Sequence, residues 1–321
     1  MEAKRFETPV ALFVFNRPDT TRRVFEAIAN VRPARLLLVA DGPRPGKGGE
    51  AEACQQVREI VSRVDWPSEV STNFAESNLG CKDRMISGLN WVFSLVEEAI
   101  ILEDDILPDP SFFSFCEAML SRYRNDSRIS MVAGFNIVQD SVRTDSSYFF
   151  SHLTHIWGWA TWRQSWARYD EKLTNWPAIR DAGLLWEIFE RAENVKYWTN
   201  VFDQMHQGTG PNTWDYQWMY TNLTNHSLSI VPRVNLVENI GFGHKATHTI
   251  DESAKPAVSV HSIELPLTHP PAVVPLRSMD RIDQRLSGFQ TPGLAKRILG
   301  RLRRVLSKFS HRPSSRHNPT P

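Results

Sequence analysis

The sequence predicts an α/β fold in which a mostly parallel sheet is flanked by helices, a Rossmann-like arrangement. Over the first 135 residues, short apolar runs alternate with segments whose apolar residues recur at helical spacing. Such strand–helix alternation is typical of parallel sheets that are covered on both faces. Hydrophobic residues make up 41% of the 321 residues, which is enough for a sizeable core.

The expected elements follow from these two patterns. Strands are predicted at residues 10–15, 36–40, 69–73, 99–102 and 131–133, and helices after Asp19 and over residues 50–64, 82–95 and 112–123. Ligands of open parallel sheets bind at the carboxyl ends of the strands. We therefore expect the functional residues directly after Phe15, Ala40 and Leu102.

An acidic triplet, Glu103, Asp104 and Asp105, follows the buried strand at residues 99–102. Adjacent carboxylates repel each other, so their clustering favours a role in holding a divalent cation or a ligand. Mn²⁺ or Mg²⁺ suits oxygen ligands and can bridge to a diphosphate. The alternative is a solvated acidic turn that begins a helix. The position at a strand end favours the first interpretation.

Polar residues also follow the other predicted strands. Arg17 comes after the first strand and can pair with phosphate, and Asp41 comes after the second and can accept hydrogen bonds from a base or ribose. Arg84, in the first turn of the helix over residues 82–95, is a further candidate for a diphosphate contact. Turn chemistry and solvated surface charge are the alternatives for these residues.

The order of these motifs resembles that of GT-A glycosyltransferases. The chain reads VALFVFNRPDTTRRVFEAI, VADGP, ESNLG and IILEDDILPDPSFFSF, and it most resembles the inverting bacterial family-2-type transferases and the N-acetylglucosaminyltransferase I group. Later segments, including SHLTHIWGWATWRQSWARYD, TWDYQWMYTN and SIVPRVNLVENIGFGHKATHT, resemble the acceptor side, the catalytic-base segment and the closing segment of those enzymes. The resemblance covers roughly residues 9–249.

The resemblance implies a role for each matching residue. It makes Asp105 the ligand of Mn²⁺ or Mg²⁺, places His244 or His248 near the metal and diphosphate, and makes Asp215 the catalytic base. It assigns contacts with the nucleotide sugar, a UDP-sugar by expectation, to Arg17, Asp41, Arg84, Glu103 and Asp104. Independently, the position of Asp215 between Trp214 and Trp218 suits a carboxylate with a raised pKa; a helix-start aspartate in an aromatic core is the alternative.

Nine of the eleven tryptophans lie between Trp157 and Trp218. Most are expected in the core. Because the C–H face of a sugar packs well on an aromatic ring, Trp157, Trp159 and Trp162 are candidates for stacking on a sugar.

The predicted organisation is one GT-A domain over residues 1–250, with a nucleotide-sugar half (1–135) and an acceptor half (136–250). An irregular connection (251–290) and a basic amphipathic tail (291–321) follow. Within the tail, residues 294–309 have the pattern of a helix that lies on an anionic membrane surface. Docking of this helix on the catalytic domain or on a partner is the alternative.

Composition excludes several classes of protein. A net charge of +1 argues against a nucleic-acid partner, and three cysteines without CxxC spacing argue against a disulfide framework or a zinc site. The first residues lack the apolar run of a signal peptide, and no apolar stretch reaches the length of a membrane span. The expected location is cytoplasmic, with peripheral association at the inner face of the plasma membrane.

The predicted function is metal-dependent, inverting transfer of a sugar from a nucleotide-diphosphate donor to a glycan, lipid-linked or protein acceptor. One alternative is a sugar-phosphate nucleotidyltransferase. Such enzymes usually need a glycine-rich loop after the first strand, where this chain has NRPDT. The other alternative is a non-catalytic, metal-dependent carbohydrate-binding protein.

Overall fold

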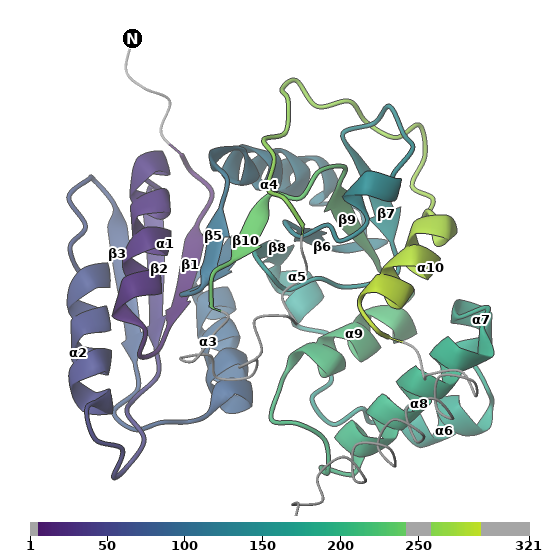
Figure 1. Ribbon diagram of the computed structural model, residues 1–321, viewed down its shortest axis with the longest axis horizontal. Helices are drawn as coiled ribbons and strands as arrows, with labels where there is room; N and C mark the ends of the chain where they lie inside the picture. The colour runs from purple at the N-terminus through teal and green to yellow at the C-terminus, as the bar shows by residue number, and fades with distance from the viewer. Residues whose placement is uncertain (1–5, 242–257, 290–321) are drawn as a thin grey trace, which may run out of the picture.

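The computed structural model describes residues 6–241 and 258–289. Its centre is an eight-stranded sheet with the order β3-β2-β1-β4-β8-β6-β9-β7, and helices cover the sheet (Figure 1). Strands β7 and β8 run against the direction of the other six. The α/β fold class with a mostly parallel sheet, predicted from the sequence, is confirmed.

The first half of the chain builds one side of this sheet. Its elements are β1 (Val10–Val14), α1 (Pro18–Val31), β2 (Arg35–Ala40), α2 (Glu50–Val61), β3 (Glu69–Phe74), α3 (Cys81–Leu95), β4 (Glu98–Glu103), β5 (Ile106–Pro108), α4 (Pro110–Tyr123) and β6 (Ile129–Ala133). All the strands and helices predicted here from the sequence are present, with ends that differ by a few residues. Helix α1 begins at Pro18, one residue before the predicted Asp19.

The second half adds more helices and short strands. They are a 3₁₀ turn (Gln139–Ser141), β7 (Tyr148–Ser151), β8 (Trp159–Trp162), α5 (Arg163–Trp166), α6 (Trp176–Asp181), α7 (Leu185–Ile188), α8 (Ala192–His206), α9 (Asp215–Thr224), β9 (Leu228–Pro232), β10 (Val237–Asn239) and α10 (Arg277–Leu286). Strand β10 pairs with β5 in a separate two-stranded sheet.

Strands β1, β2 and β4 lie in the middle of a two-sided core. Successive residues of a strand point to opposite faces. Leu12 of β1 therefore packs in the cluster that includes residues of α1, α2 and α4, whereas its neighbour Phe13 packs in the cluster that includes residues of α3, α5 and α9. Burial on both faces explains why these strands read as continuous apolar runs in the sequence.

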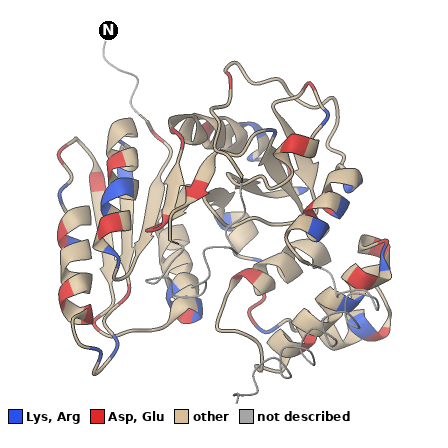
Figure 2. Cartoon of the chain, viewed as in Figure 1, with Lys and Arg blue, Asp and Glu red and all other residues tan. Residues whose placement is uncertain are grey.

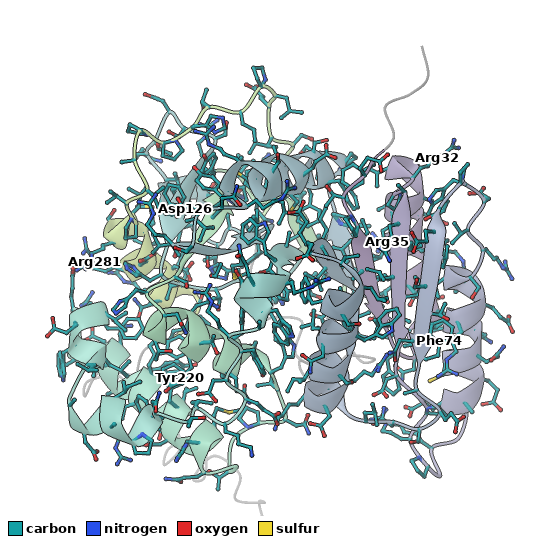
Figure 3. The ribbon with its side chains drawn as sticks, turned by 180° about the vertical axis from the view of Figure 1, so that it is seen from behind. Arg32, Arg35, Phe74, Asp126, Tyr220 and Arg281 are labelled. Carbon is teal, nitrogen blue, oxygen red and sulfur yellow. The ribbon has the colours of Figure 1, made fainter. Side chains whose placement is uncertain are left out.

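The parallel register brings the carboxyl ends of the strands to one edge. Val14 of β1 lies beside Ala40 of β2, and Phe13 lies beside Glu103 of β4. Figure 3 shows the strands from behind. Arg35 marks the start of β2 and Phe74 marks the end of β3, and the two residues lie at opposite edges of the sheet. The edge near Phe74 is the one where the fold predicts a ligand.

The tryptophans of β8 are core residues. Trp159 and Trp162 are 0% and 2% exposed, and Trp159 contacts Trp214 and Trp218 at ring-centroid distances of 5.5 and 5.9 Å. Their predicted role in stacking on a sugar is therefore wrong, because β8 lies between β4 and β6 within the sheet. Trp157 is only partly buried and packs on Phe135.

The segment predicted to be an irregular connection contains a helix, α10. Its buried carboxylates fasten it to the loop that follows β7. Asp280 accepts a hydrogen bond from Ser151 Oγ at 2.6 Å and lies 2.8 Å from His152 Nδ1, and Asp283 lies 2.6 Å from His155 Nε2. The predicted irregular structure across residues 251–290 is wrong for this helix, whose buried face combines Asp280, Asp283 and Gln284 with Met279.

Two other sequence predictions fall outside the described residues, namely the basic tail at 291–321 and the histidines His244 and His248. Within the described ranges, each helix is too short or too polar to cross a membrane. In the view of Figure 2, acidic and basic residues are interspersed over the helices on both sides of the molecule, in keeping with the net charge of +1.

The pairing of His155 with Asp283 predicts a pH-dependent stability. Burial alone lowers the pKa of His155, but the Asp283 carboxylate outweighs burial and raises it overall. The stability from this pair is therefore fully present below the ordinary histidine pKa of about 6.5, and it is lost as the pH rises through the higher folded-state value. His155→Leu, which leaves Asp283 buried without its partner, should cost about 3 kcal/mol.

Urea denaturation at pH 6 and pH 9 measures this effect. The free-energy difference between wild type and His155→Leu should be larger at pH 6. His206→Leu, at an exposed histidine, is the control and should show no such dependence. An equal difference at both pH values would contradict the pairing.

Candidate active site

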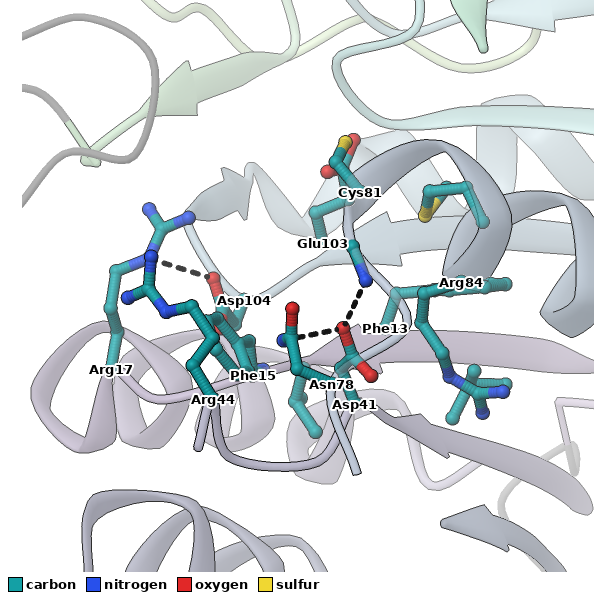
Figure 4. A pocket seen from close by; sticks show the side chains of 14 residues that line it. Phe13, Phe15, Arg17, Asp41, Arg44, Asn78, Cys81, Arg84, Glu103 and Asp104 are labelled. Atoms are coloured by element: carbon teal, nitrogen blue, oxygen red, sulfur yellow. Dashed lines mark hydrogen bonds and ion pairs between the residues drawn. The ribbon is translucent and has the colours of Figure 1, made fainter. Parts of the chain in front are cut away.

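A pocket of about 200 Å³ lies at the carboxyl edge of the sheet (Figure 4). Its walls come from the ends of β1, β2 and β4 and from the loop before α3. Residues predicted from the sequence line it, namely Arg17, Asp41, Arg84, Glu103 and Asp104. Asp105 is not part of the lining, but it is ion-paired to Arg17 at the side of the pocket.

Arg17 is the cation at the centre of the acidic triplet. Its Nη1 donates to Asp105 Oδ2 at 2.6 Å, and its Nε lies 3.4 Å from Asp104 Oδ1. The second oxygen of Asp104 accepts a hydrogen bond from the Phe15 backbone N–H at 3.0 Å. These contacts tie the end of β1 to the end of β4.

One guanidinium faces three carboxylates, so negative charge is in excess. Burial, followed by the neighbouring carboxylates of Asp105 and Asp104, raises the pKa of Glu103. Burial also raises the pKa of Asp104, although Arg17 opposes this effect. A site that raises the pKa of its own carboxylates in this way is suited to take up a further positive charge.

Strand β10 fixes the backbone of the triplet from the other side. The N–H of Ile240 donates to the carbonyl oxygen of Asp105 at 2.8 Å, directly after the pairing of Asn239 with Ile106. Gly241 then passes so close that a Cβ atom there would lie 2.1 Å from Asp105 Oδ2 and 2.6 Å from Arg17 Nη1. Only glycine fits beside this ion pair.

Asp41, predicted to contact the nucleotide, is engaged with the protein. Its carboxylate accepts hydrogen bonds from Asn78 Nδ2 at 2.8 Å and from the backbone N–H groups of Gly42, Leu79 and Gly80 at 2.8, 2.9 and 3.2 Å. Asp41 therefore shapes the loop that forms one wall of the pocket.

Arg84 lines the pocket from α3, but its guanidinium is also engaged. Its Nη2 donates to the carbonyl oxygen of Asn73 at 2.5 Å and to Asn73 Oδ1 at 2.9 Å. Burial lowers its pKa. These contacts fasten α3 to the end of β3.

The sequence did not indicate a third arginine of the pocket, Arg44. Its guanidinium lies over the ring of Phe15, 5.5 Å from the centroid, and it is paired with the buried Glu50. The backbone N–H of Arg44 also donates to Glu50 at 2.7 Å, and hydrogen bonding to Arg44 lowers the pKa of Glu50. No motif marked this pair, because it lies in a glycine-rich loop that reads as a flexible turn.

Asp215 is the first residue of α9, close to the pocket. It accepts a hydrogen bond from Thr213 Oγ1, and its charge helps to raise the pKa of both Glu103 and Cys81. Cys81 lines the pocket, so Asp215 acts electrostatically on groups at the pocket wall. The structure thus brings the predicted base near the predicted nucleotide-sugar residues.

The described residues contain no group of three or more His, Cys, Asp or Glu side chains arranged to hold a metal ion by themselves. His244 and His248, predicted near the metal, lie outside these residues.

Comparison with known proteins gives limited information. No protein-family model and no curated protein matches the chain. Among solved structures, the crystal structure of mannose-1-phosphate geranyltransferase from Thermus thermophilus is similar at 11% identity and a TM-score of 0.37, over 72% of this chain and 75% of that one.

A second similar structure is UDP-glucose pyrophosphorylase complexed with UDP-glucose, at 8% identity and a TM-score of 0.25. The match covers 45% of this chain and 62% of the pyrophosphorylase, which is less than two thirds of its length. At such scores the two likenesses carry no argument about function, which has to come from the site itself.

The crowding at Gly241 predicts that Gly241→Ala forces the Asp105 and Arg17 side chains apart. Overpacking of this kind should lower the free energy of unfolding by about 1–3 kcal/mol. Gly48→Ala is the control, since a Cβ atom there has no neighbour within 4 Å, and it should change stability by less than about 0.5 kcal/mol. Urea denaturation of both variants tests this, and equal stabilities would contradict the close approach.

Proposed function

We propose that the protein is a metal-dependent glycosyltransferase that moves a sugar, with inversion, from a nucleoside-diphosphate sugar to an acceptor hydroxyl. The observation that carries this proposal is the convergence of the Arg17–acidic triplet cluster and the Asp41-held loop on one pocket, with Asp215 close by. These groups offer contacts for a base, for a diphosphate and for the reacting sugar at one edge of the sheet.

The nucleotide side of the pocket suits a flat base and an anion. Phe15 and Arg44 present an aromatic ring and a planar guanidinium to the pocket, and both groups stack on bases. Gly80 and Cys81, at the start of α3, also line it, and helix N-termini favour phosphates. A uridine diphosphate sugar is the first nucleotide sugar to test.

The residues present fit a divalent cation. The observation behind this statement is the clustering of three carboxylates around one guanidinium, that of Arg17. Burial, together with the neighbouring carboxylates, raises the pKa of Glu103 and Asp104. Mg²⁺ is commonly held by one or two carboxylates together with substrate phosphates. Asp105, less buried than Asp104, would hold Mn²⁺ or Mg²⁺, with His244 or His248 as a further proposed ligand. When bound, the cation would neutralise the departing diphosphate.

Asp215 is the proposed base. In a single displacement, it takes the proton of the acceptor hydroxyl as that oxygen attacks the sugar carbon. The new C–O bond forms as the bond to the diphosphate breaks on the opposite face, which inverts the configuration. Thr213, through its hydrogen bond, orients the carboxylate, and Arg17 stays charged beside the leaving group.

Lipid-linked, glycan and protein acceptors all present a hydroxyl that this reaction can use. Association of the basic segment at 294–309 with an anionic membrane remains part of the proposal for a lipid-linked acceptor. The product would then be a bacterial surface polysaccharide, and the enzyme would lie at the cytoplasmic face of the membrane.

A nucleotidyltransferase reaction is favoured less. Such an enzyme needs backbone N–H groups after the first strand to hold a triphosphate. Here the N–H of Phe15 is engaged with Asp104 at 3.0 Å, and Pro18 has no N–H. The third alternative, a carbohydrate-binding protein without activity, gives Asp215 no role.

Thermal stability in the presence of nucleotide sugars tests the metal and the pocket together. A nucleotide sugar at 100 times its Kd should add about 2.7 kcal/mol, a shift of several degrees, in Mn²⁺ but not in EDTA. Asp105→Asn should abolish the shift, and Asp140→Asn, at an exposed site, should retain it. An undiminished shift in EDTA would show that no cation is needed.

Steady-state kinetics tests the base. Asp215→Asn should lower kcat by roughly 10²–10⁴-fold and leave the nucleotide-sugar thermal shift unchanged. Asp140→Asn again serves as the control. Normal turnover in Asp215→Asn would refute the role of this residue. Release of pyrophosphate from a nucleoside triphosphate and a sugar phosphate would instead favour the nucleotidyltransferase.

A further inference from the structure

A second, smaller cavity lies beside Asp215, on the acceptor side. Thr154 and Ile156 of the loop after β7, Trp198 of α8, Tyr216 and Met219 of α9, and Phe289 complete its lining. Its volume is about 30 Å³, room for about two water molecules. Ligand pockets are typically about 300–1,000 Å³, so an acceptor sugar cannot enter this cavity as it stands.

Phe289 is the one lining residue that comes from the segment after α10. Its ring packs against Trp198 and Tyr197 of α8, at centroid distances of 5.2 and 5.7 Å. Its carbonyl oxygen accepts a hydrogen bond from Asn194 Nδ2 at 2.8 Å. Gly288 has a φ of +73°, and this left-handed turn after α10 directs the chain back onto α8.

The other walls of the cavity are anchored more firmly. Trp198 is 1% exposed, and the loop that carries Thr154 is held on both sides by the pairs of His152 with Asp280 and His155 with Asp283. Phe289 is partly buried, as are Thr154, Ile156 and Tyr216. Because Phe289 lies beyond the last residue of α10, Leu286, its ring can move without breaking the two histidine–aspartate pairs.

Trp198 also has an unused polar atom. Its Nε1 is buried without a hydrogen-bond partner within the described part of the chain. The Nε1 atoms of Trp159, Trp162 and Trp218 are also buried without a partner in the described residues, but Trp198 is the one of these four tryptophans that lines this cavity. An acceptor oxygen bound beside its indole would supply the hydrogen-bond partner that buried donors usually have. A sugar has both features that this site needs: an apolar C–H face to lie on the indole, and oxygens to accept its N–H.

We propose that this cavity is the closed form of the acceptor subsite, and that Phe289 occupies the place which an acceptor sugar takes when its hydroxyl reaches Asp215. This inference rests on the proposed function, because it identifies the acceptor side of the same site. Phe289 thereby selects acceptors, since only a sugar that displaces its ring from Trp198 can bind.

Binding of methyl glycosides tests the subsite without requiring turnover. The probes are methyl α- and β-glycosides of glucose, galactose, mannose and N-acetylglucosamine, and binding is measured by ligand-observed NMR titration. Phe289→Ala removes the competing ring, so at least one glycoside should bind about tenfold more tightly than to wild type. Leu286→Ala, at a 54% exposed residue of the same helix end, should bind like wild type.

Phe289→Trp provides the opposite test, because a larger ring should weaken binding of the same glycoside below the wild-type level. Thermal denaturation shows whether each variant is folded. If Phe289→Ala is not folded, Phe289→Leu takes its place. Equal affinities of wild type and all Phe289 variants would overturn the proposal. A different outcome separates the two proposals. If Phe289→Ala binds a glycoside more tightly, but the protein neither transfers sugar to any glycoside nor shows a thermal shift with nucleotide sugars, the sugar-binding site stands and the proposed transferase activity is refuted.

Discussion

The ion pairs of Arg17 are the interaction on which the rest of the site depends. Three consecutive residues at the end of β4 carry carboxylates, and without a cation their mutual repulsion and burial would push this strand end apart. Arg17 supplies that cation from the end of the neighbouring strand, β1, through contacts of 2.6 and 3.4 Å. Because one cation meets three carboxylates, the cluster remains short of positive charge. The same arrangement therefore stabilises the sheet edge, and in the proposed function it would also hold a divalent ion. Gly241 shows how tightly β10 closes on this pair.

The pocket at the carboxyl edge of the sheet, which we propose binds the nucleotide sugar, could be located from the sequence because it is built from local patterns. Strands such as Val10–Val14 are apolar on both faces, and the parallel register that follows from strand–helix alternation brings Arg17, Asp41 and Glu103 to one edge. The individual roles were harder to predict. The partners of Asp41 lie 37 to 39 residues along the chain at Asn78, Leu79 and Gly80, and no spacing rule connects them. A strand-end carboxylate can shape a pocket as well as contact its ligand, and only the folded contacts distinguish these two roles.

Two errors concern the second half of the chain. Trp159 and Trp162 were candidates for exposed stacking, yet the antiparallel strand β8 buries both. Helix α10 was missed because it directly follows the proline-rich stretch at residues 256–275, although Met279, Ile282 and Leu286 recur at helical spacing. Its docking combines the packing of Met279 with buried pairs to His152 and His155, some 128 residues away. A residue's burial depends on the partners that the fold provides, and the sequence reveals apolar partners more readily than polar ones.

Different interactions therefore hold the two sides of the proposed site in place. The nucleotide side rests on the register of the central strands, which is hard to alter without loss of the core. The proposed acceptor side rests on α8, α9 and the segment after α10, where Phe289 is held by a hydrogen bond from Asn194 and by ring contacts with Trp198 and Tyr197. Such contacts can exchange for equivalent contacts with a ligand at little net cost, because a sugar offers oxygens for Trp198 and an apolar face for its ring. We therefore expect recognition of the nucleotide to be rigid, and choice of acceptor to be set by the residue that a ligand must displace, Phe289.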